Sequence, residues 1–479
     1  MMKIRGTKSA TFATTIFSCA LFLGGCTVGP NYKRPNTDVP TSYRTLPPAE
    51  PVVTPPANSS TQSVGDQKWW EVFQDEQLQK LIRTALQQNF DARIAATRVL
   101  ELQAQLGITR ANQYPNIRAI GTGVNLHNPA QGPFPSYGYS QGEIGISGSW
   151  DIDFWGKYRR ATEAARANLL ATNWAQQEVN STLVANVAAA FFQLRELDLE
   201  LDISQKALAS RKESLDLTKT LEEHGINSIL DVRQAEQLVY TADAEITDLT
   251  RRIAQQENLI SVLLGNNPGP IEPRGKELVD QPHPPAVPAG LPSALLERRP
   301  DIRQSEQLLT AANAQIGVAR AAYFPDVALT GTTGFQSASL TSLFSGPAGL
   351  WTFAANVTQP IFNAGQIRSN VRLAQAQQQE AVLTYQQAIQ GAFRDVSDAL
   401  IAYQQNQQFR AQEELLANSA QDAAQLSNKR YEAGTTNYLE VLTNQTNYFS
   451  SELGLAQARL NELLSLVQIY KSLGGGWQQ

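Results

Sequence analysis

The chain has 479 residues, 17% of them charged, and a formal net charge of −5 at pH 7. A mildly acidic chain without basic runs is poorly suited to bind nucleic acid. It holds two cysteines, Cys19 and Cys26.

The first residues predict an export signal. Lys3, Arg5 and Lys8 precede an apolar run over residues 10–23, which is too short to span a bilayer comfortably. The run ends in Leu23-Gly24-Gly25-Cys26, an order that resembles a bacterial lipobox. The resemblance implies removal of residues 1–25, a diacylglycerol on the thiol of Cys26 and an acyl chain on its amino group. The alternative is an ordinary signal peptide with an incidental cysteine. Once Cys19 leaves with the signal, no intrachain disulfide is possible.

Residues 26–68 are rich in proline and predict a tether without a packed core. Asp75 is a candidate N-cap for the helix that follows the Trp69-Trp70 pair. Apolar residues recur there at helical spacing, and Asp91 begins another helix.

The next stretch occurs twice. Residues 105–122, QLGITRANQYPNIRAIGT, are echoed 210 residues later by residues 315–332, QIGVARAAYFPDVALTGT. In both, helical spacing changes to β-type residues at a proline, Pro115 or Pro325, which cannot continue a helix. Further echoes at an offset of 209 predict two copies of one unit, over residues 69–265 and 293–473. Proline-rich residues 266–292 link them, and residues 474–479 form a tail.

Two strands are predicted in each copy, over residues 115–126, 140–154, 325–336 and 350–361. The last three alternate apolar and polar residues over about ten positions, which is typical of a membrane barrel strand. The first fits this pattern poorly. A soluble hairpin with one buried face is the alternative.

A long helix follows each strand pair. Residues 157–223 contain no proline or glycine, which predicts a helix on the order of 100 Å. Apolar residues at 4-3 spacing, such as Leu183, Val187 and Leu194, predict a left-handed supercoil. Each long helix is expected to end at a glycine C-cap, Gly225 or Gly434, before a return helix.

No residues carry an enzyme hypothesis. The three histidines, His127, His224 and His283, fall in different predicted loops or turns, so no metal set or nucleophile–base pair is evident. Asp231 and Glu440 take matching positions at the start of the return helices. They are capping residues at a helix N-terminus, or a ring of carboxylates at the mouth of a tube, and the two roles are compatible.

The duplicated unit behind a lipobox resembles the TolC-type outer-membrane efflux proteins, in particular the NodT-like lipoprotein branch that serves resistance–nodulation–division pumps. The most specific stretches are Cys26-Thr-Val-Gly-Pro-Asn-Tyr-Lys-Arg-Pro35, Arg298-Arg-Pro-Asp-Ile-Arg303 and Arg430-Tyr431-Glu-Ala-Gly434-Thr-Thr-Asn-Tyr-Leu439-Glu440-Val-Leu442. The resemblance implies a mainly α-helical fold with a membrane β-barrel. A homotrimer would form a twelve-stranded β-barrel continuous with a periplasmic α-helical barrel.

The resemblance also implies site residues. It places a periplasmic gate at Asp231, Tyr431, Leu439 and Glu440, and adaptor-docking tips at Gly225, Ile226, Asn227, Gly434, Thr435 and Thr436. Thr436 and Thr443 stand where other members have Arg and a second Asp, so fewer gate salt bridges are expected.

The implied function is a passive exit duct that exports small molecules such as drugs across the outer membrane of a Gram-negative bacterium. The implied partners are a periplasmic adaptor, an inner-membrane pump and outer-membrane lipid. No cofactor beyond the lipid on Cys26 and no metal are expected. Two alternatives remain, a type I protein secretion duct and a non-conducting trimeric scaffold or adhesin.

Overall fold

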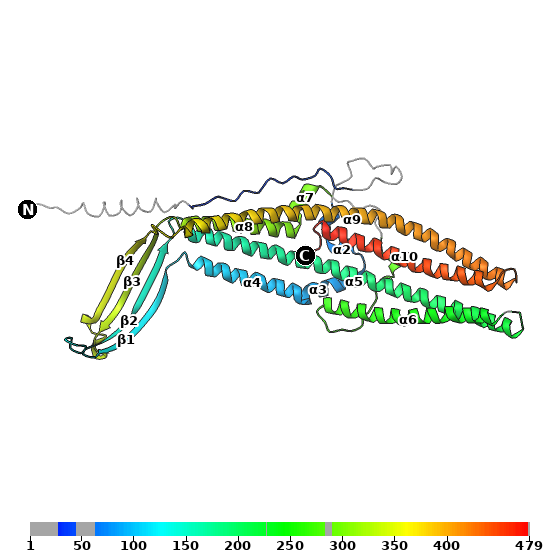
Figure 1. Ribbon diagram of the computed structural model, residues 1–479, viewed down its shortest axis with the longest axis horizontal. Coiled ribbons are helices and arrows are strands. Elements are labelled where there is room, and N and C mark those ends of the chain that lie inside the picture. The colour runs from blue at the N-terminus through cyan, green and yellow to red at the C-terminus, as the bar shows by residue number, and fades with distance from the viewer. Residues whose placement is uncertain (1–26, 45–62, 227, 283–289, 478–479) are drawn as a thin grey trace, which may run out of the picture. The chain divides into compact units, whose positions relative to one another are not determined.

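The computed structural model describes residues 27–44, 63–226, 228–282 and 290–477. The predicted signal peptide, Cys26 and Asn227 lie outside these described residues. The main helices and strands in chain order are α2 (Trp69–Val72), α3 (Glu76–Gln88), α4 (Phe90–Ala111), β1 (Asn116–Asn128), β2 (Tyr137–Ile152), α5 (Lys157–Glu223), α6 (Ile229–Leu263), α7 (Pro292–Arg298), α8 (Pro300–Ala321), β3 (Asp326–Ser337), β4 (Gly349–Thr358), α9 (Gln366–Glu432) and α10 (Tyr438–Ser472) (Figure 1). Short 3-10 turns lie at Val64–Asp66, Leu278–Asp280, Leu340–Ser342 and Gly346–Ala348.

The helices confirm the duplicated strand–strand–long helix–helix unit. α4 and α8 each have 22 residues, α5 and α9 each have 67, and α6 and α10 each have 35. The four predicted strands are present, with ends within three residues of the expected positions. Asp75 caps α3 by accepting hydrogen bonds from the backbone N–H groups of Gln77 and Leu78.

The chain divides into two compact units. One comprises the residues up to Asn36, Val99–Thr172 and Gln304–Tyr385, and holds the four strands. They form an antiparallel sheet in the order β1-β2-β3-β4, so β2 of the first copy pairs with β3 of the second (Figure 1). β1 and β4 are therefore the edge strands of this sheet.

One face of the sheet is apolar. The cross-strand register aligns Gly148, Gly331 and Phe353 in one row and Trp150, Leu329 and Ala355 in the next. Phe353 is 69% exposed. Side chains alternate between faces along a strand, so Glu143, Ser147 and Thr330, with other polar residues, fall on the opposite face. Such a large exposed apolar surface marks a contact with another apolar phase.

β1 departs from this pattern, as its sequence predicts. Ile117 and Ala119 lie on the apolar face, but the register puts Ile120, Val124 and Leu126 on the other. Leu126 there pairs with Tyr139 of β2. The two-faced pattern is thus weakest along β1.

Residues 27–36, part of the predicted tether, pack along helices within this unit. The Arg34 guanidinium donates to both carboxylate oxygens of Glu306 in α8, at 2.6 and 2.8 Å. The backbone N–H of Val28 donates to the Trp155 carbonyl at 3.0 Å, and Arg160 of α5 donates to Asn31 Oδ1 at 2.8 Å. A bidentate pair with the buried Glu306 fixes this segment in register.

The other unit comprises Thr37–Arg98, Asn173–Arg303 and Gln386–Gln479. Its main core gathers α3, α5, α6 and α10 around aromatic side chains, with Phe73 and Tyr470 in edge contact at 5.6 Å. Leu183, Val187 and Leu194 of the predicted seam are buried. α5 turns into α6, and α9 into α10 (Figure 1).

In the described part of the chain, no helix has both the length and the apolar content needed to cross a membrane.

Candidate functional site

The turn between α5 and α6 closes as its sequence predicts. Gly225 adopts a φ of +73°, which glycine reaches without a Cβ clash. The N–H of Ile226 donates to the Leu221 carbonyl at 2.9 Å, and that of Gly225 to the Glu222 carbonyl at 2.8 Å. These two bonds form a Schellman motif, which satisfies carbonyls at the end of α5.

Asp231 forms the predicted capping box at the start of α6. Its carboxylate accepts from the backbone N–H of Ser228 at 3.2 Å, and its own N–H donates to the Ser228 hydroxyl at 3.4 Å. The negative charge also lies at the positive end of the helix dipole. The capping role of Asp231 is therefore confirmed.

The turn between α9 and α10 repeats the first one. Gly434 has a φ of +70°. The N–H of Thr435 donates to the Arg430 carbonyl and that of Gly434 to the Tyr431 carbonyl, both at 2.9 Å. Asn437 caps α10 by accepting from the backbone N–H of Glu440 at 3.2 Å. Both turns thus have the same backbone conformation, a Schellman motif with a glycine at positive φ.

Glu440 differs from Asp231 in where its carboxylate points. It accepts from Arg430 Nη1 at 2.7 Å and from the Thr436 hydroxyl, and it makes no reciprocal box with Asn437. The Arg430 and Glu440 side chains are 55% and 35% exposed, so the ion pair is a surface pair of small energy. Thr436, predicted as a docking-tip residue that lacks the charge of an Arg, donates its hydroxyl hydrogen to the Glu440 carboxylate.

A small core lies beside these turns. Val232 and Val239 of α6 pack with Leu215 of α5 and with Tyr438 and Val441 of α10. The two helical hairpins therefore share buried apolar surface.

Tyr431 is packed against this core. Its ring meets that of Tyr438 at 5.4 Å, tilted by 61°. Burial raises the pKa of Tyr438 to about 12, so its phenol stays neutral at physiological pH. Both rings line a cavity of about 190 Å³ that also touches Glu213 and Asn428.

The predicted tip residues that the structure describes are accessible. Ile226 is 69% exposed, and Leu439, predicted for the gate, is 54% exposed. Gly225, Gly434 and Thr435 are also exposed, whereas Thr436 is half-buried. Among the described residues, no hydrogen bond or ion pair joins Asp231 to Glu440, so one chain does not bring the two carboxylates together.

Two contributors to the site were missed from the sequence. Arg430 pairs with a carboxylate ten residues later, which becomes visible only when the turn geometry is known. Tyr438 had a local signal, because it stands three residues before Val441 on what is now the buried face of α10.

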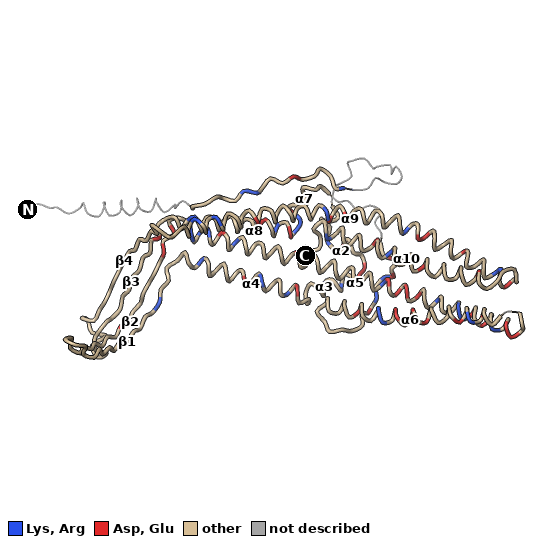
Figure 2. Tube along the Cα trace, in the orientation of Figure 1, with Lys and Arg blue, Asp and Glu red and all other residues tan. Residues whose placement is uncertain are grey.

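The described residues contain no group of three or more histidine, cysteine or acidic side chains placed to hold a metal ion. Figure 2 shows acidic and basic residues interspersed along α6, next to the first turn. The tips are thus mixed polar surfaces built on helix caps.

Comparison with known proteins identifies the family. The family model for "Outer membrane efflux protein" matches residues 81–266 and 291–475. The solvent efflux pump outer membrane protein SrpC of Pseudomonas putida is 37% identical over 477 residues, covering 95% of this chain and 97% of SrpC. The cation efflux system protein CusC of Escherichia coli is 35% identical over 464 residues, covering 97% of this chain and 98% of CusC.

A solved structure agrees with these sequence matches. The open-state structure of the MtrE outer membrane channel of Neisseria gonorrhoeae superposes with a TM-score of 0.85 at 30% identity, over 95% of this chain and 99% of MtrE. The chain therefore belongs to the outer membrane efflux protein family, and it is the outer-membrane channel of an efflux system, not an enzyme.

Proposed function

We propose that the chain forms a homotrimeric, passive exit duct for small molecules. Each copy gives β1–β4 to a twelve-stranded barrel and its long helices to a periplasmic helical barrel. The observation that carries this proposal is the sheet, which has an exposed apolar face, a polar opposite face and two edge strands.

The two edge strands of the sheet support a barrel that is closed by further copies of the chain. β1 and β4 each offer a row of backbone N–H and C=O groups on the side away from the sheet. In lipid each unsatisfied group costs several kcal/mol, so strands cross a bilayer as closed barrels. Four strands alone are too few to close, because bacterial barrels have eight or more.

The cargo we propose is small and chemically varied. SrpC is named for solvent efflux and CusC for cation efflux. A duct shared by relatives with such different cargo suits a passive role, with selection made by the inner-membrane pump. We assign that pump to the resistance–nodulation–division class, joined to the duct by a periplasmic adaptor.

A covalent lipid on Cys26 is part of the proposal. Thr27, the next residue, lies against Gly156, where a Cβ atom would stand 3.0 Å from the Thr27 Cα. Thr27 is therefore held beside the junction that follows β2, which supports a lipid anchor on the residue before it. A single acyl chain gives only marginal membrane binding, whereas the diacylglycerol and the N-acyl chain together carry three. The lipid would therefore be a second membrane anchor beside the barrel.

We assign the gate to Asp231, Tyr431, Leu439 and Glu440. Three copies of the carboxylate pair would put six negative charges around one opening. The turn residues Gly225, Ile226, Asn227, Gly434, Thr435 and Thr436 are the proposed adaptor-docking tips.

Two mass measurements on the purified protein test assembly and lipidation. Native mass spectrometry should give three chains, and the intact chain mass should exceed that of Cys26→Ser by the lipid. We expect the Cys26→Ser protein to remain trimeric in the outer membrane, because the barrel is the main anchor. A variant that is wholly soluble in the periplasm would contradict the barrel.

A susceptibility test addresses cargo. Deleting the gene should lower tolerance to solvents or antibiotics, and the wild-type gene should restore it. Loss of a secreted protein without any change in tolerance would favour the type I secretion alternative.

A further inference from the structure

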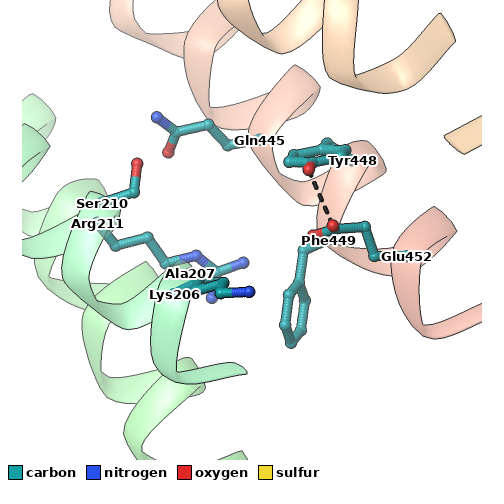
Figure 3. A pocket seen from close by; sticks show the side chains of 8 residues that line it. All are labelled: Lys206, Ala207, Ser210, Arg211, Gln445, Tyr448, Phe449 and Glu452. Carbon is teal, nitrogen blue, oxygen red and sulfur yellow. Dashed lines mark hydrogen bonds between the residues drawn. The ribbon is translucent and has the colours of Figure 1, made fainter. Parts of the chain in front are cut away.

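A cavity of about 140 Å³ lies between α5 and α10, in the unit that contains Asn173–Arg303 and Gln386–Gln479 (Figure 3). Its lining residues are Lys206, Ala207, Ser210, Arg211, Gln445, Tyr448, Phe449 and Glu452. None of them belongs to the proposed gate or docking tips.

Arg211 is the unusual group in this lining. It is only 4% exposed. Its Nη1 donates to the Leu238 carbonyl of α6 at 3.0 Å, and its guanidinium lies 4.7 Å from the centre of the Phe449 ring. Within the described part of the chain, no carboxylate pairs with it. Buried charges in proteins are normally paired.

The buried Arg195 and the largely buried Arg299 of the same unit follow that rule. Arg195 pairs with Asp198 at 2.5 Å, and Arg299 pairs with Asp301 at 2.5 Å. Arg211 instead has carbonyl and aromatic partners, and burial lowers its pKa. A guanidinium of this kind has unused donors for an anion.

Gln445 leaves a second polar atom unused. Its Nε2 donates to Ser214 at 3.3 Å and to Asn428 at 3.1 Å, whereas its buried Oε1 has no partner in the structure. Figure 3 shows the Gln445 amide and the Arg211 guanidinium on facing sides of the same space. The cavity thus offers a cation and an acceptor to one ligand.

The remaining walls suit a partly apolar molecule. The Phe449 ring and the Ala207 methyl group supply apolar surface. Glu452 accepts from the Tyr448 hydroxyl at 2.8 Å, which occupies an oxygen of its carboxylate, and burial raises its pKa. Lys206 adds a positive charge, shared with Asp202 at 2.6 Å. For scale, an engineered apolar cavity of about 150 Å³ holds benzene.

We propose that this cavity binds a small organic anion, whose carboxylate pairs with Arg211 and whose apolar part lies against Phe449 and Ala207. The lining comes from α5 and α10, and Arg211 is bonded to α6, so the bound anion bridges the two helical hairpins. This inference is independent of the proposed cargo.

The probe is 4-fluorobenzoate, followed by ¹⁹F NMR on the purified full-length protein in detergent at constant ionic strength. Saturable binding is expected, and 4-fluorobenzyl alcohol, which lacks the charge, should bind at least about tenfold more weakly. Arg211→Gln should weaken 4-fluorobenzoate binding by about tenfold or more, because it removes a charge-assisted contact.

A second pair of variants keeps the test decisive if Arg211→Gln fails to fold. Ala207→Leu fills the cavity without a charge change and should abolish binding. Ala209→Leu, two residues along the same helix and exposed, should bind as the wild type does. The proposal is overturned if the wild type shows no saturable binding at millimolar probe. It is also overturned if folded Arg211→Gln or Ala207→Leu binds like the wild type.

Discussion

The two carboxylates at the turns give the sharpest prediction, because they have two separable roles. Asp231 and Glu440 lie at the starts of α6 and α10, where they bond to Ser228 or to Arg430 and Thr436. In the proposed trimer they also put six negative charges around one opening, which attracts cations. Two double variants separate capping from charge.

The first variant is Asp231→Ala with Glu440→Ala. It removes the N3 carboxylate of the α6 capping box but keeps the Ser228 N-cap, and a carboxylate at a helix N-terminus is worth about 0.3–1 kcal/mol. At α10 the Asn437 cap remains, and the exposed Arg430–Glu440 pair is worth at most about 1 kcal/mol. We expect a modest drop in Tm, a smaller cation preference and a leakier resting pore.

The second variant is Asp231→Asn with Glu440→Gln. It keeps a carbonyl oxygen at each position for hydrogen bonding but removes both charges. We expect nearly wild-type stability together with the same loss of cation preference.

The assay is the reversal potential of the reconstituted channel under a salt gradient, with thermal unfolding measured in parallel. If both folded double variants keep the wild-type reversal potential, the gate assignment is wrong and only capping remains.

Three further predictions test the fold. Leu194→Pro places an interior proline in the buried seam of α5, at a cost of roughly 3 kcal/mol per chain, and should abolish trimers on native gels; wild-type trimer yield would contradict a wall role. Gly434→Ala forces a Cβ onto a φ of +70° and should destabilise the fold by about 1–2 kcal/mol, which lowers Tm. Gly391→Ala inside α9 should instead raise Tm, and equal changes of Tm in the two variants would refute the turn geometry. Burial beside Glu200 raises the pKa of Glu196 from its ordinary 4.5 to about 8. The folded protein then holds a proton that the unfolded chain releases, so stability should fall as pH rises from about 4.5 to 8. Glu196→Gln should flatten that slope of Tm against pH, and an unchanged slope would contradict the assignment.

Much of this fold is predictable from local signals. Pro115 and Pro325 directly precede β1 and β3, four residues after α4 and α8 end, and Gly225 and Gly434 follow α5 and α9. The element boundaries are therefore set by local chemistry that is repeated at a fixed offset. Repetition strengthens each weak signal, because the same pattern occurs twice. The capping box of Asp231 is equally local, since its partner Ser228 is three residues away.

Contacts distant in sequence were not predictable in the same way. Arg34 meets Glu306 across 272 residues, and no spacing rule marks either residue in advance. Arg211 also looks like an ordinary exposed helix residue in the sequence. Its isolation from carboxylates is visible only once α5, α6 and α10 are packed together.

Planar-bilayer recording of the purified wild-type protein tests the central claim most directly. A trimeric export channel predicts discrete, reproducible conductance steps whose frequency rises with protein concentration. The matched control is the Leu194→Pro protein, which we expect to insert no channels. A pure, folded trimer that enters the bilayer yet conducts no ions under any voltage or salt gradient would contradict the account.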